Sequence, residues 1–476
     1  MYAAKRVTGN DVELVIPRVD WTANTKYRQY DDTTSIPILL SADTSANLKP
    51  MYVITPERRV YKCLANNSSA NSTIKPTHDY VSSNGTLSGS DGYVWKYMFT
   101  VQPSNKFLTD SWVPAPTSAS ALDYGVSSLG VVDGELSTIV MSNNGSNYRQ
   151  TTNVKISAFA SGQQNIQLAN TSNVLAWLSI SSLANIANMS ISGQGIPSGT
   201  YITNAVTANG LITLSTDTSA IGGDNSNTYT ITTRVYVDGD GIGFAANAIL
   251  SNTDINVSNG DANVAKVNVT VVGTNYSRAN VFIYGSGYGA NARAILSPKY
   301  GHAYNPAKEL NANNVMVAVR IGEIDSTEDG LISVATTFRQ IGLMRDPHKY
   351  GNTSSVSSAD ANNVISQTRN LVLISGPTYS LNEYVYQGTS AATAYAYGYL
   401  NSISDDNTTV RLTKVKGTFR ISEQLFGLTS GTARTVTSIV DPTFEPYSGD
   451  ILYIENDTAT TRADGQAENI KLTVSF

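Results

Sequence analysis

Apolar residues recur at every second position in many short runs of this chain, which is the period of a β-strand with one buried face. Near the start, Val12, Leu14 and Ile16 alternate with other residues, and at the end the run Ile470–Phe476 does the same. A further apolar run, 451–454, precedes the last one. We therefore expect the closing segment to complete a β-core that the N-terminal residues begin.

Strand patterns continue through the first hundred residues and again after residue 301. The runs 51–54 and 60–64 flank Thr55-Pro56-Glu57-Arg58-Arg59 and predict a hairpin, and the aromatic run 93–99 predicts a well-packed strand. Further along, 306–310 predicts one helical turn, followed by strands at 315–321 and 338–345.

A compact β-pattern lies between two boundaries near residues 365 and 441. Its strands are predicted at 371–374, 384–387, 394–400, 410–415 and 435–440, with glycine turns between them. Short strands at this spacing predict a small barrel or sandwich. The Ser-, Asn- and Ala-rich stretch 350–363 before it is typical of a linker.

An internal repeat occupies residues from about 120 to 300. Gly145-Ser146-Asn147-Tyr148 matches Gly273-Thr274-Asn275-Tyr276, and 153–156 matches 280–283. A Gly-x-Gly-x-Gly run follows in each copy, at 285–289 in the second but only at 239–243 in the first. Residues 160–234 therefore form a nested insert, and two copies favour a pair of β-modules over a solenoid.

Composition supports an all-β fold with few short helices. The 476 residues predict two to four domains, and only 14% are charged, whereas Gly and Tyr are abundant. This composition is typical of secreted modules and viral structural proteins. We predict a discontinuous β-sandwich core carrying inserted small β-sandwich or barrel modules. The core comprises 1–116, 301–350 and 442–476, and the inserts are a tandem β-repeat module at 117–300 and a small β-barrel at 365–441.

The net charge and the cysteine content limit the binding partners and sites that the chain can have. The net charge is −5 without a basic cluster, which argues against nucleic-acid binding. The single cysteine, Cys63, excludes an intrachain disulfide and a cysteine-based zinc site. We expect neither membrane insertion nor a signal peptide, and folding in a reducing cytoplasm.

Candidate chemical groups are scattered, and we predict no catalytic, cofactor-binding or metal-binding residue and no enzyme. His78, His302 and His348 are each interpreted as solvated loop residues. The Gly-x-Gly-x-Gly runs precede no helix, so close β packing is favoured over a phosphate site. The carboxylates show no convergent pair, and the segment 238–241 resembles a calcium loop without the remaining ligand spacing.

Aromatic residues leave two interpretations open. Trp21, Trp95 and Trp112 lie beside apolar strand residues, which favours core or interface anchors. The alternative is a carbohydrate-binding surface, because rings stack on sugar faces.

Three separated stretches together resemble one family. They are Val15–Trp21; Val60–Leu64 with Asp91–Phe99; and Phe338–Pro347 with Gly449–Asn456 and Glu468–Phe476. In their order, and at the extreme C-terminus, they are similar to the dimeric baseplate wedge subunit of T-even-like contractile-tailed bacteriophages. The family has a longer segment ahead of the first motif, and the regions 120–300 and 365–441 have no counterpart in its shorter members.

The resemblance implies a β-sandwich core, a homodimer and contacts with other baseplate wedge subunits in the virion tail, after synthesis in the host cytoplasm. It implies no catalysis. The alternative function is a carbohydrate-binding phage adhesin or a tailspike or fibre protein. Because exposed ion pairs contribute little, we expect the interfaces to depend on aromatic anchors in the loops at 21–30 and around Trp112.

Overall fold

A computed structural model gives the fold over 3–79, 86–118, 131–149, 151–157, 174–177, 186–193, 195–206, 211–217, 228–252, 262–321, 338–357, 364–404, 406–460 and 468–476. About half of these residues lie in β-strands, and the α-helices among them are the short α1 (Ile36–Leu40) and α2 (Pro306–Glu309). The prediction of an all-β fold with few short helices is confirmed. Among the described residues, every helix is too short to cross a membrane.

The chain divides into two compact units. One contains Leu14–Asn313, and the other contains Met1–Glu13 together with Asn314–Phe476. Strand β2 (Val12–Pro17) begins in the second of these units and ends in the first. The domain limits drawn from the sequence stay predictions, and each unit is described by itself below.

The first part of the unit 14–313 is an antiparallel sheet. Its order is β5 (Tyr52–Ile54), β6 (Arg59–Asn66), β8 (Tyr93–Thr100) and β7 (Thr86–Ser88). The predicted hairpin is confirmed, because Ile54 lies opposite Val60. In the same unit, β2 pairs with β9 (Trp112–Pro114), and β3 (Lys26–Tyr27) pairs in parallel with β4 (Leu48–Lys49).

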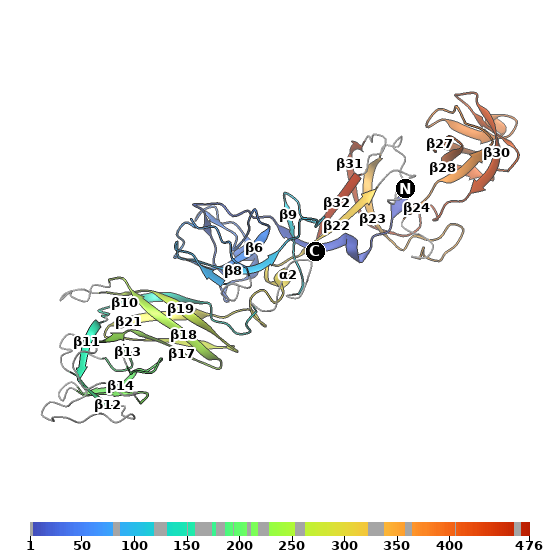
Figure 1. Cartoon of the computed structure of the whole chain (residues 1–476). Helices are drawn as coiled ribbons and strands as arrows, with labels where there is room; N and C mark the ends of the chain where they lie inside the picture. The colour runs from blue at the N-terminus through green and yellow to red at the C-terminus, as the bar shows by residue number, and fades with distance from the viewer. Residues whose placement is uncertain are drawn as a thin grey trace. The chain divides into compact units, whose positions relative to one another are not determined.

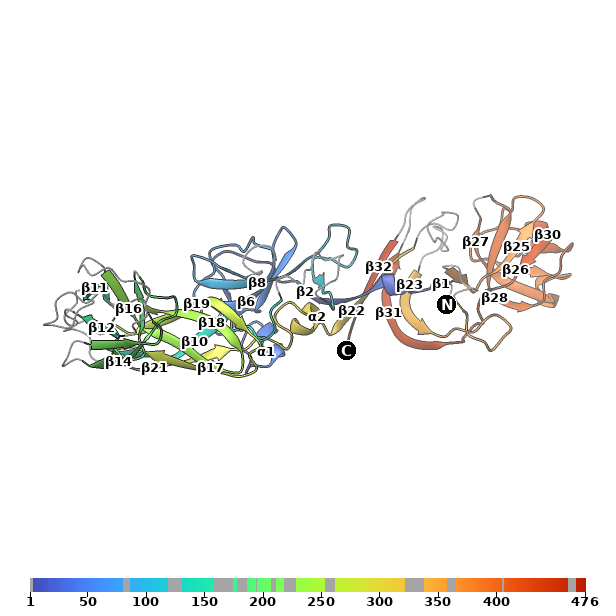
Figure 2. The same ribbon diagram turned by 60° about the horizontal axis from the view of Figure 1, so that its bottom comes forward.

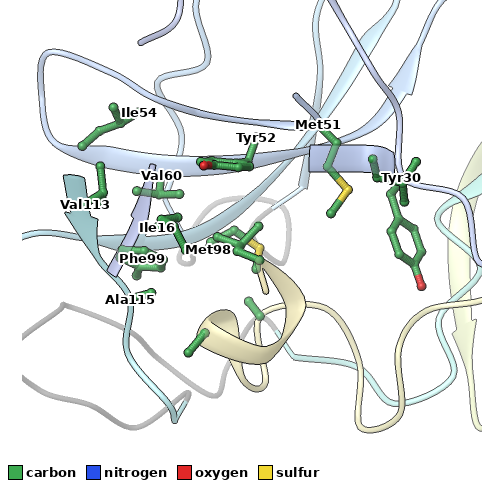
Figure 3. Close-up of a cluster of buried hydrophobic side chains, with 14 of the residues drawn as sticks. Ile16, Tyr30, Met51, Tyr52, Ile54, Val60, Met98, Phe99, Val113 and Ala115 are labelled. Atoms are coloured by element: carbon green, nitrogen blue, oxygen red, sulfur yellow. The ribbon is translucent and has the colours of Figure 1, made fainter. Parts of the chain in front are cut away.

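The hydrophobic core of this part lies against one face of the sheet. Figure 3 shows its buried side chains, among them Ile16, Tyr52, Met98 and Phe99. The same cluster includes apolar residues from far along the chain, namely Ile295, Ala303, Ala307 and Leu310. Residues near 300 therefore belong to the core that the first hundred residues build.

The repeat forms a six-stranded antiparallel sheet (Figures 1 and 2), and its strand order and register show an internal twofold symmetry. Its order is β10 (Thr138–Ser146), β21 (Tyr288–Ile295), β20 (Ala279–Tyr284), β17 (Arg234–Gly239), β18 (Ile242–Leu250) and β19 (Val264–Thr274). Asn143 lies opposite Asn291 in one half, and the equivalent Val271 lies opposite Ala245 in the other. A β-bulge follows at the same step in both halves. The repeated sequence thus specifies register as well as strands.

The two halves of the repeat interlock through tyrosine and glycine. A Cβ atom on Gly285 would lie 2.8 Å from the Tyr148 ring, and one on Gly239 would lie 2.9 Å from the Tyr276 ring. Each tyrosine therefore packs on the glycine run of the other copy, and both rings are buried. Close β packing, predicted for these runs in place of a phosphate site, is confirmed.

The nested insert makes a sheet of its own. The order is β13 (Ser190–Gly193), β16 (Thr228–Thr232), β11 (Thr151–Ser157), β12 (Val174–Trp177), β15 (Leu211–Leu214) and β14 (Ile202–Val206). Strand β11 contains the segment 153–156 that the sequence matched to 280–283. These two segments do not form equivalent strands, because β17, and not β11, is the symmetry partner of β20.

The other unit contains three antiparallel strand pairs, and in one of them β22 also pairs with β2. Strand β1 (Ala3–Lys5) pairs with β24 (Val364–Ser366), β22 (Asn314–Ile321) with β32 (Glu468–Ser475), and β23 (Phe338–Arg345) with β31 (Asp450–Thr460). The strands predicted at 315–321, 338–345, 451–454 and 470–476 are therefore present. The predicted linker 350–363 is described only to residue 357.

A closed six-stranded barrel completes this unit, drawn in orange to red in Figure 1. Its order is β25 (Arg369–Leu373), β28 (Thr409–Gly417), β27 (Ala396–Ile403), β26 (Tyr384–Gln387), β29 (Gln424–Gly427) and β30 (Ala433–Val440). The sequence pattern missed β29, whose four residues are too few to show a period. Leu371, Val385, Leu400, Leu412 and Leu425 are fully buried in its interior.

We predict that Gly241→Ala and Gly287→Ala destabilise the repeat sheet equally, by about 1–3 kcal/mol each, because overpacking at symmetric positions costs the same. In both cases the new methyl group would overlap a buried tyrosine ring and a backbone carbonyl. Hydrogen exchange of β10 and β18 measures the effect. Gly9→Ala is the control, since no atom lies within 4 Å of its Cβ position. Unequal losses would contradict the symmetric interlock.

Candidate functional site

Two lysines are completely buried in the sheet of the unit 14–313. Lys62 on β6 lies directly opposite Lys96 on β8, and both side chains are 0% exposed. Like charges on opposed strand positions repel each other, and a buried ammonium group needs a partner. Strands β6 and β8 therefore require negative charge from elsewhere in the chain.

Two glutamates provide this charge from distant segments. The Nζ atom of Lys62 lies 2.9 Å from Oε2 of Glu309 at the end of α2, and that of Lys96 lies 3.2 Å from Oε1 of Glu135. Glu309 and Glu135 are only 5% and 1% exposed. The four side chains form a neutral, buried ionic cluster.

His302 and Tyr30 complete the cluster around Lys62. The Lys62 ammonium donates to Nδ1 of His302 across 3.0 Å, and it lies 3.8 Å above the Tyr30 ring. The His302 ring meets Tyr30 edge to face at 5.0 Å. Because Nδ1 accepts this hydrogen bond, the imidazole is neutral and carries its proton on Nε2.

Burial and charge set the pKa values of the cluster. Burial, and then the neighbouring Lys62, lower the pKa of His302 to about 3. Burial alone would raise the pKa of Glu309, but the neighbouring Lys62 ammonium holds it below its ordinary value. Burial raises the pKa of Glu135 and lowers that of Lys62, in each case against the pull of the ion-pair partner. Glu309 is therefore charged at neutral pH.

The cluster joins four segments of the chain. β6 and β8 contribute the lysines, the residues just before β10 contribute Glu135, and the segment 302–309 after β21 contributes His302 and Glu309. Arg293 of β21 adds a second ionic contact at the surface, with Asp31 at 2.7 Å and also with Asp32. Both ends of the repeat module are thus fastened to the first sheet.

This arrangement is suited to rigidity rather than to turnover. The ionic side chains are at most 5% exposed, so a substrate cannot reach them in this conformation. A general acid or base must be within hydrogen-bond reach of its substrate. The cluster therefore acts as a structural lock, which we call the Lys62–Lys96 lock.

The interpretation of the histidines as solvated is wrong for two of the three. His302 belongs to the lock and is 2% exposed, and His78 is buried against Tyr61 with ring centres 5.0 Å apart. His348 is half-buried at a bridge to Ser355. Both buried histidines follow turn residues in the sequence, and local sequence does not show that the turns fold inward.

The other polar candidates act locally. Asp240, within the segment that resembles a calcium loop, accepts from the backbone N–H groups of Ser277 and Arg278 at 2.9 and 3.1 Å. These hydrogen bonds, with that of the Ser277 hydroxyl, lower the pKa of Asp240. No cluster of three or more potential metal ligands occurs in the described parts of the chain.

The three tryptophans named from the sequence occupy different environments. Trp95 is buried in an aromatic cluster with Tyr27 and Tyr93. Trp21 is half-buried against that cluster, and its Nε1 donates to Ser72 at 3.2 Å. Trp112 is half-buried on β9. Trp95 is therefore a core anchor, as favoured above.

Sequence reasoning missed the lock, although a signal for half of it was present. Lys62 and Lys96 each interrupt an apolar strand run at a position where a buried residue is expected. Their glutamate partners lie 247 and 39 residues away, and nothing local identifies them.

We predict that Glu309→Gln destabilises the unit 14–313 by about 3–5 kcal/mol, because it leaves the Lys62 ammonium buried without a counter-charge. The double variant Lys62→Met/Glu309→Leu should recover most of this loss. Denaturant unfolding measures both. The control is Glu57→Gln at the exposed Lys75 pair, which should cost at most about 1 kcal/mol. Equal effects at both sites would contradict the lock.

A second prediction concerns acid. The pKa of His302 is about 3 in the folded chain, whereas in the unfolded chain it has its ordinary value of 6.5. Between these values the unfolded state binds more protons, so this contribution to stability is complete above pH 6.5 and is lost as the pH falls toward 3. His302→Gln should flatten the dependence of stability on pH in that window. An unchanged profile in His302→Gln would contradict the assignment.

Comparisons of the chain with protein-family models, with curated proteins and with solved structures found no match. The conclusions about function therefore rest on the residues and geometry of this chain. The buried lock, the symmetric repeat and the exposed apolar and aromatic surfaces of the chain are the observations that bear on its function.

Proposed function

We propose that this protein is a structural subunit of a bacteriophage tail baseplate wedge, which self-associates and contacts other wedge subunits. The single observation that carries the structural role is an exposed apolar ribbon, β23 with β31. The particular assembly is proposed from the resemblance of the sequence motifs to the wedge family.

The ribbon exposes three large apolar side chains on one of its strands. On β31, Ile451 and Leu452 are each 60% exposed and Ile454 is 52% exposed. A β-bulge lies at Leu452, because Met344 pairs with Ile451 and Leu343 pairs with Tyr453. Bulges re-aim side chains, and here the apolar side chains at and beside the bulge are exposed. A two-stranded sheet is marginally stable by itself in water, and an uncovered apolar patch marks an interaction surface.

The family-like motifs build the same ribbon. Phe338–Pro347 supplies β23 and Gly449–Asn456 supplies most of β31, and the two pair although they are about a hundred residues apart. The motifs at 60–64 and 91–99 similarly meet as β6 and β8. These separated stretches form joint structural elements, which supports treating them as one motif set.

A second copy of the chain fits the free edge of β31. Among the described residues, β31 pairs only with β23, so its other edge is open. If two β31 strands pair antiparallel about Tyr453, Leu452 of each copy lies opposite Ile454 of the other copy. In that register Glu455 faces Ile451 and Asp450 faces Asn456, so no two acidic residues oppose each other. Such isologous pairing gives a closed dimer.

The interfaces expected at Trp21 and Trp112 are less favoured by the structure, since the Trp21 ring already packs within the unit 14–313 and Trp112 is half-buried there. Their role in assembly stays a prediction. The ribbon offers larger apolar exposure in a motif that the family resemblance includes.

We predict that Leu452→Lys/Ile454→Lys weakens self-association of the purified full chain at least about tenfold, because it places charge in the apolar pairs. Sedimentation equilibrium measures the dimer constant. Ile374→Lys, at a side chain that is 68% exposed on the barrel unit, is the matched control and should leave it unchanged. A monomeric wild-type chain, or a dimer insensitive to the double substitution, would overturn the ribbon interface.

The assignment to the wedge is tested separately on virions. Antibodies against the full chain, seen by electron microscopy, should label the baseplate ring. Label confined to the tip of a fibre would favour the adhesin alternative and reject the wedge.

A further inference from the structure

Five aromatic rings line up on the outer wall of the barrel. Strands β26, β27 and β29 direct Val385, Leu400 and Leu425 into the interior. Because side chains alternate along a strand, the intervening residues face outward. These are Tyr384, Tyr386, Tyr397, Tyr399 and Phe426, and we call them the aromatic platform.

The register of the strands makes the platform continuous. Tyr386 lies opposite both Tyr397 and Phe426, and Tyr384 lies opposite Tyr399. The rings of Tyr384 and Tyr397 are 5.1 Å apart and inclined by 30°, and those of Tyr386 and Phe426 are 5.5 Å apart and inclined by 27°. Near-parallel rings at these distances overlap face against face, whereas Tyr399 meets Tyr384 edge-on, with the ring centres 5.7 Å apart and the planes inclined by 79°. The rings therefore form a continuous aromatic row across three neighbouring strands. Tyr399 remains 41% exposed at its margin.

Two lysines border the platform on the next strand, β28. Lys416 lies opposite Tyr397. A bulge in the β27–β28 ladder places Lys414, with a φ of 51°, so that its ammonium is 5.8 Å from the Tyr399 ring. Bulges re-aim side chains, and a non-glycine residue at positive φ is strained. Neither lysine forms an ion pair among the described residues.

The charge of the barrel differs from that of the chain. Residues 369–440 contain six Lys or Arg and four Asp or Glu, a net charge of +2, whereas the whole chain carries −5. Of the acidic residues, Glu383 is buried and accepts from the backbone of Thr429 and Ser430, and Glu423 bonds Tyr395. The lysines at the platform margin therefore favour an anionic ligand.

We propose that the aromatic platform binds an acidic polysaccharide. The apolar C–H face of a sugar ring packs on the negative face of an aromatic ring, and a row of aromatic rings across neighbouring strands offers several such contacts. Tyrosine hydroxyls at the ring margins donate to sugar oxygens, and Lys414 and Lys416 pair with carboxylates on the chain. Single-stranded nucleic acid is less favoured, because it requires a longer basic groove along its backbone.

This inference is independent of the wedge assignment and of the β31 interface. It gives the barrel a ligand of its own, which a baseplate subunit or a fibre protein could each use at the host surface. The aromatic pairs also stabilise neighbouring strands, so the test separates binding from folding.

The full-length chain is run in native gels containing alginate, polygalacturonate or hyaluronate, with dextran as the neutral polymer. We expect retardation by the acidic polymers and at least about tenfold weaker binding by Tyr386→Ala and Tyr397→Ala. Lys414→Gln/Lys416→Gln should reduce the preference for acidic over neutral polymer. Val440→Ala, at a residue 51% exposed elsewhere on the barrel, is the control and should bind normally.

Thermal unfolding of each variant is measured alongside binding. Where an alanine variant is destabilised, Tyr386→Phe serves as the second variant, because it keeps the ring and should retain most of the binding. The proposal is overturned by no retardation of the wild type, or by retardation that the tyrosine substitutions leave unchanged. Binding of oligo-dT that is lost in the same variants, without polysaccharide binding, would assign the platform to nucleic acid instead.

Discussion

The pairing of two buried lysines with two distant glutamates is the constraint on which the unit 14–313 depends. Lys62 and Lys96 sit side by side at 0% exposure, and a strand pair carrying them could not be buried without Glu309 and Glu135. These glutamates lie on either side of the repeat module in the sequence. The charge balance of the first sheet therefore requires the module's two ends to return to it, and His302 follows as a neutral acceptor.

The repeat module holds two copies of one motif together, although one copy contains a large insertion. Each copy's buried tyrosine packs on the glycine run of the other, so neither half can close alone. The insert leaves after Tyr148 and returns at β17, where the symmetric sheet resumes in register. A long insertion costs little entropy because loop closure becomes only slightly more costly as the loop lengthens.

The second unit presents its chemistry on surfaces. The apolar ribbon and the aromatic platform both lie at the surface in the described part of this unit, whereas the ionic side chains of the lock are buried in the other unit. A chain with 14% charged residues depends on such surfaces for recognition, since exposed ion pairs contribute little. Rigid cores with apolar and aromatic exteriors suit a protein that works by contact.

The sequence by itself determined the all-β fold, most strands, the repeat and the small barrel, because strand period and turn residues are local properties read within a few positions. The tertiary structure alone decided that β17 rather than β11 completes the repeat, that β29 closes the barrel, and that His302 is buried. It also decided which carboxylates meet Lys62 and Lys96, and that five rings share one outer wall. These outcomes depend on which strands become neighbours, and residues up to 247 positions apart meet only after the chain has folded.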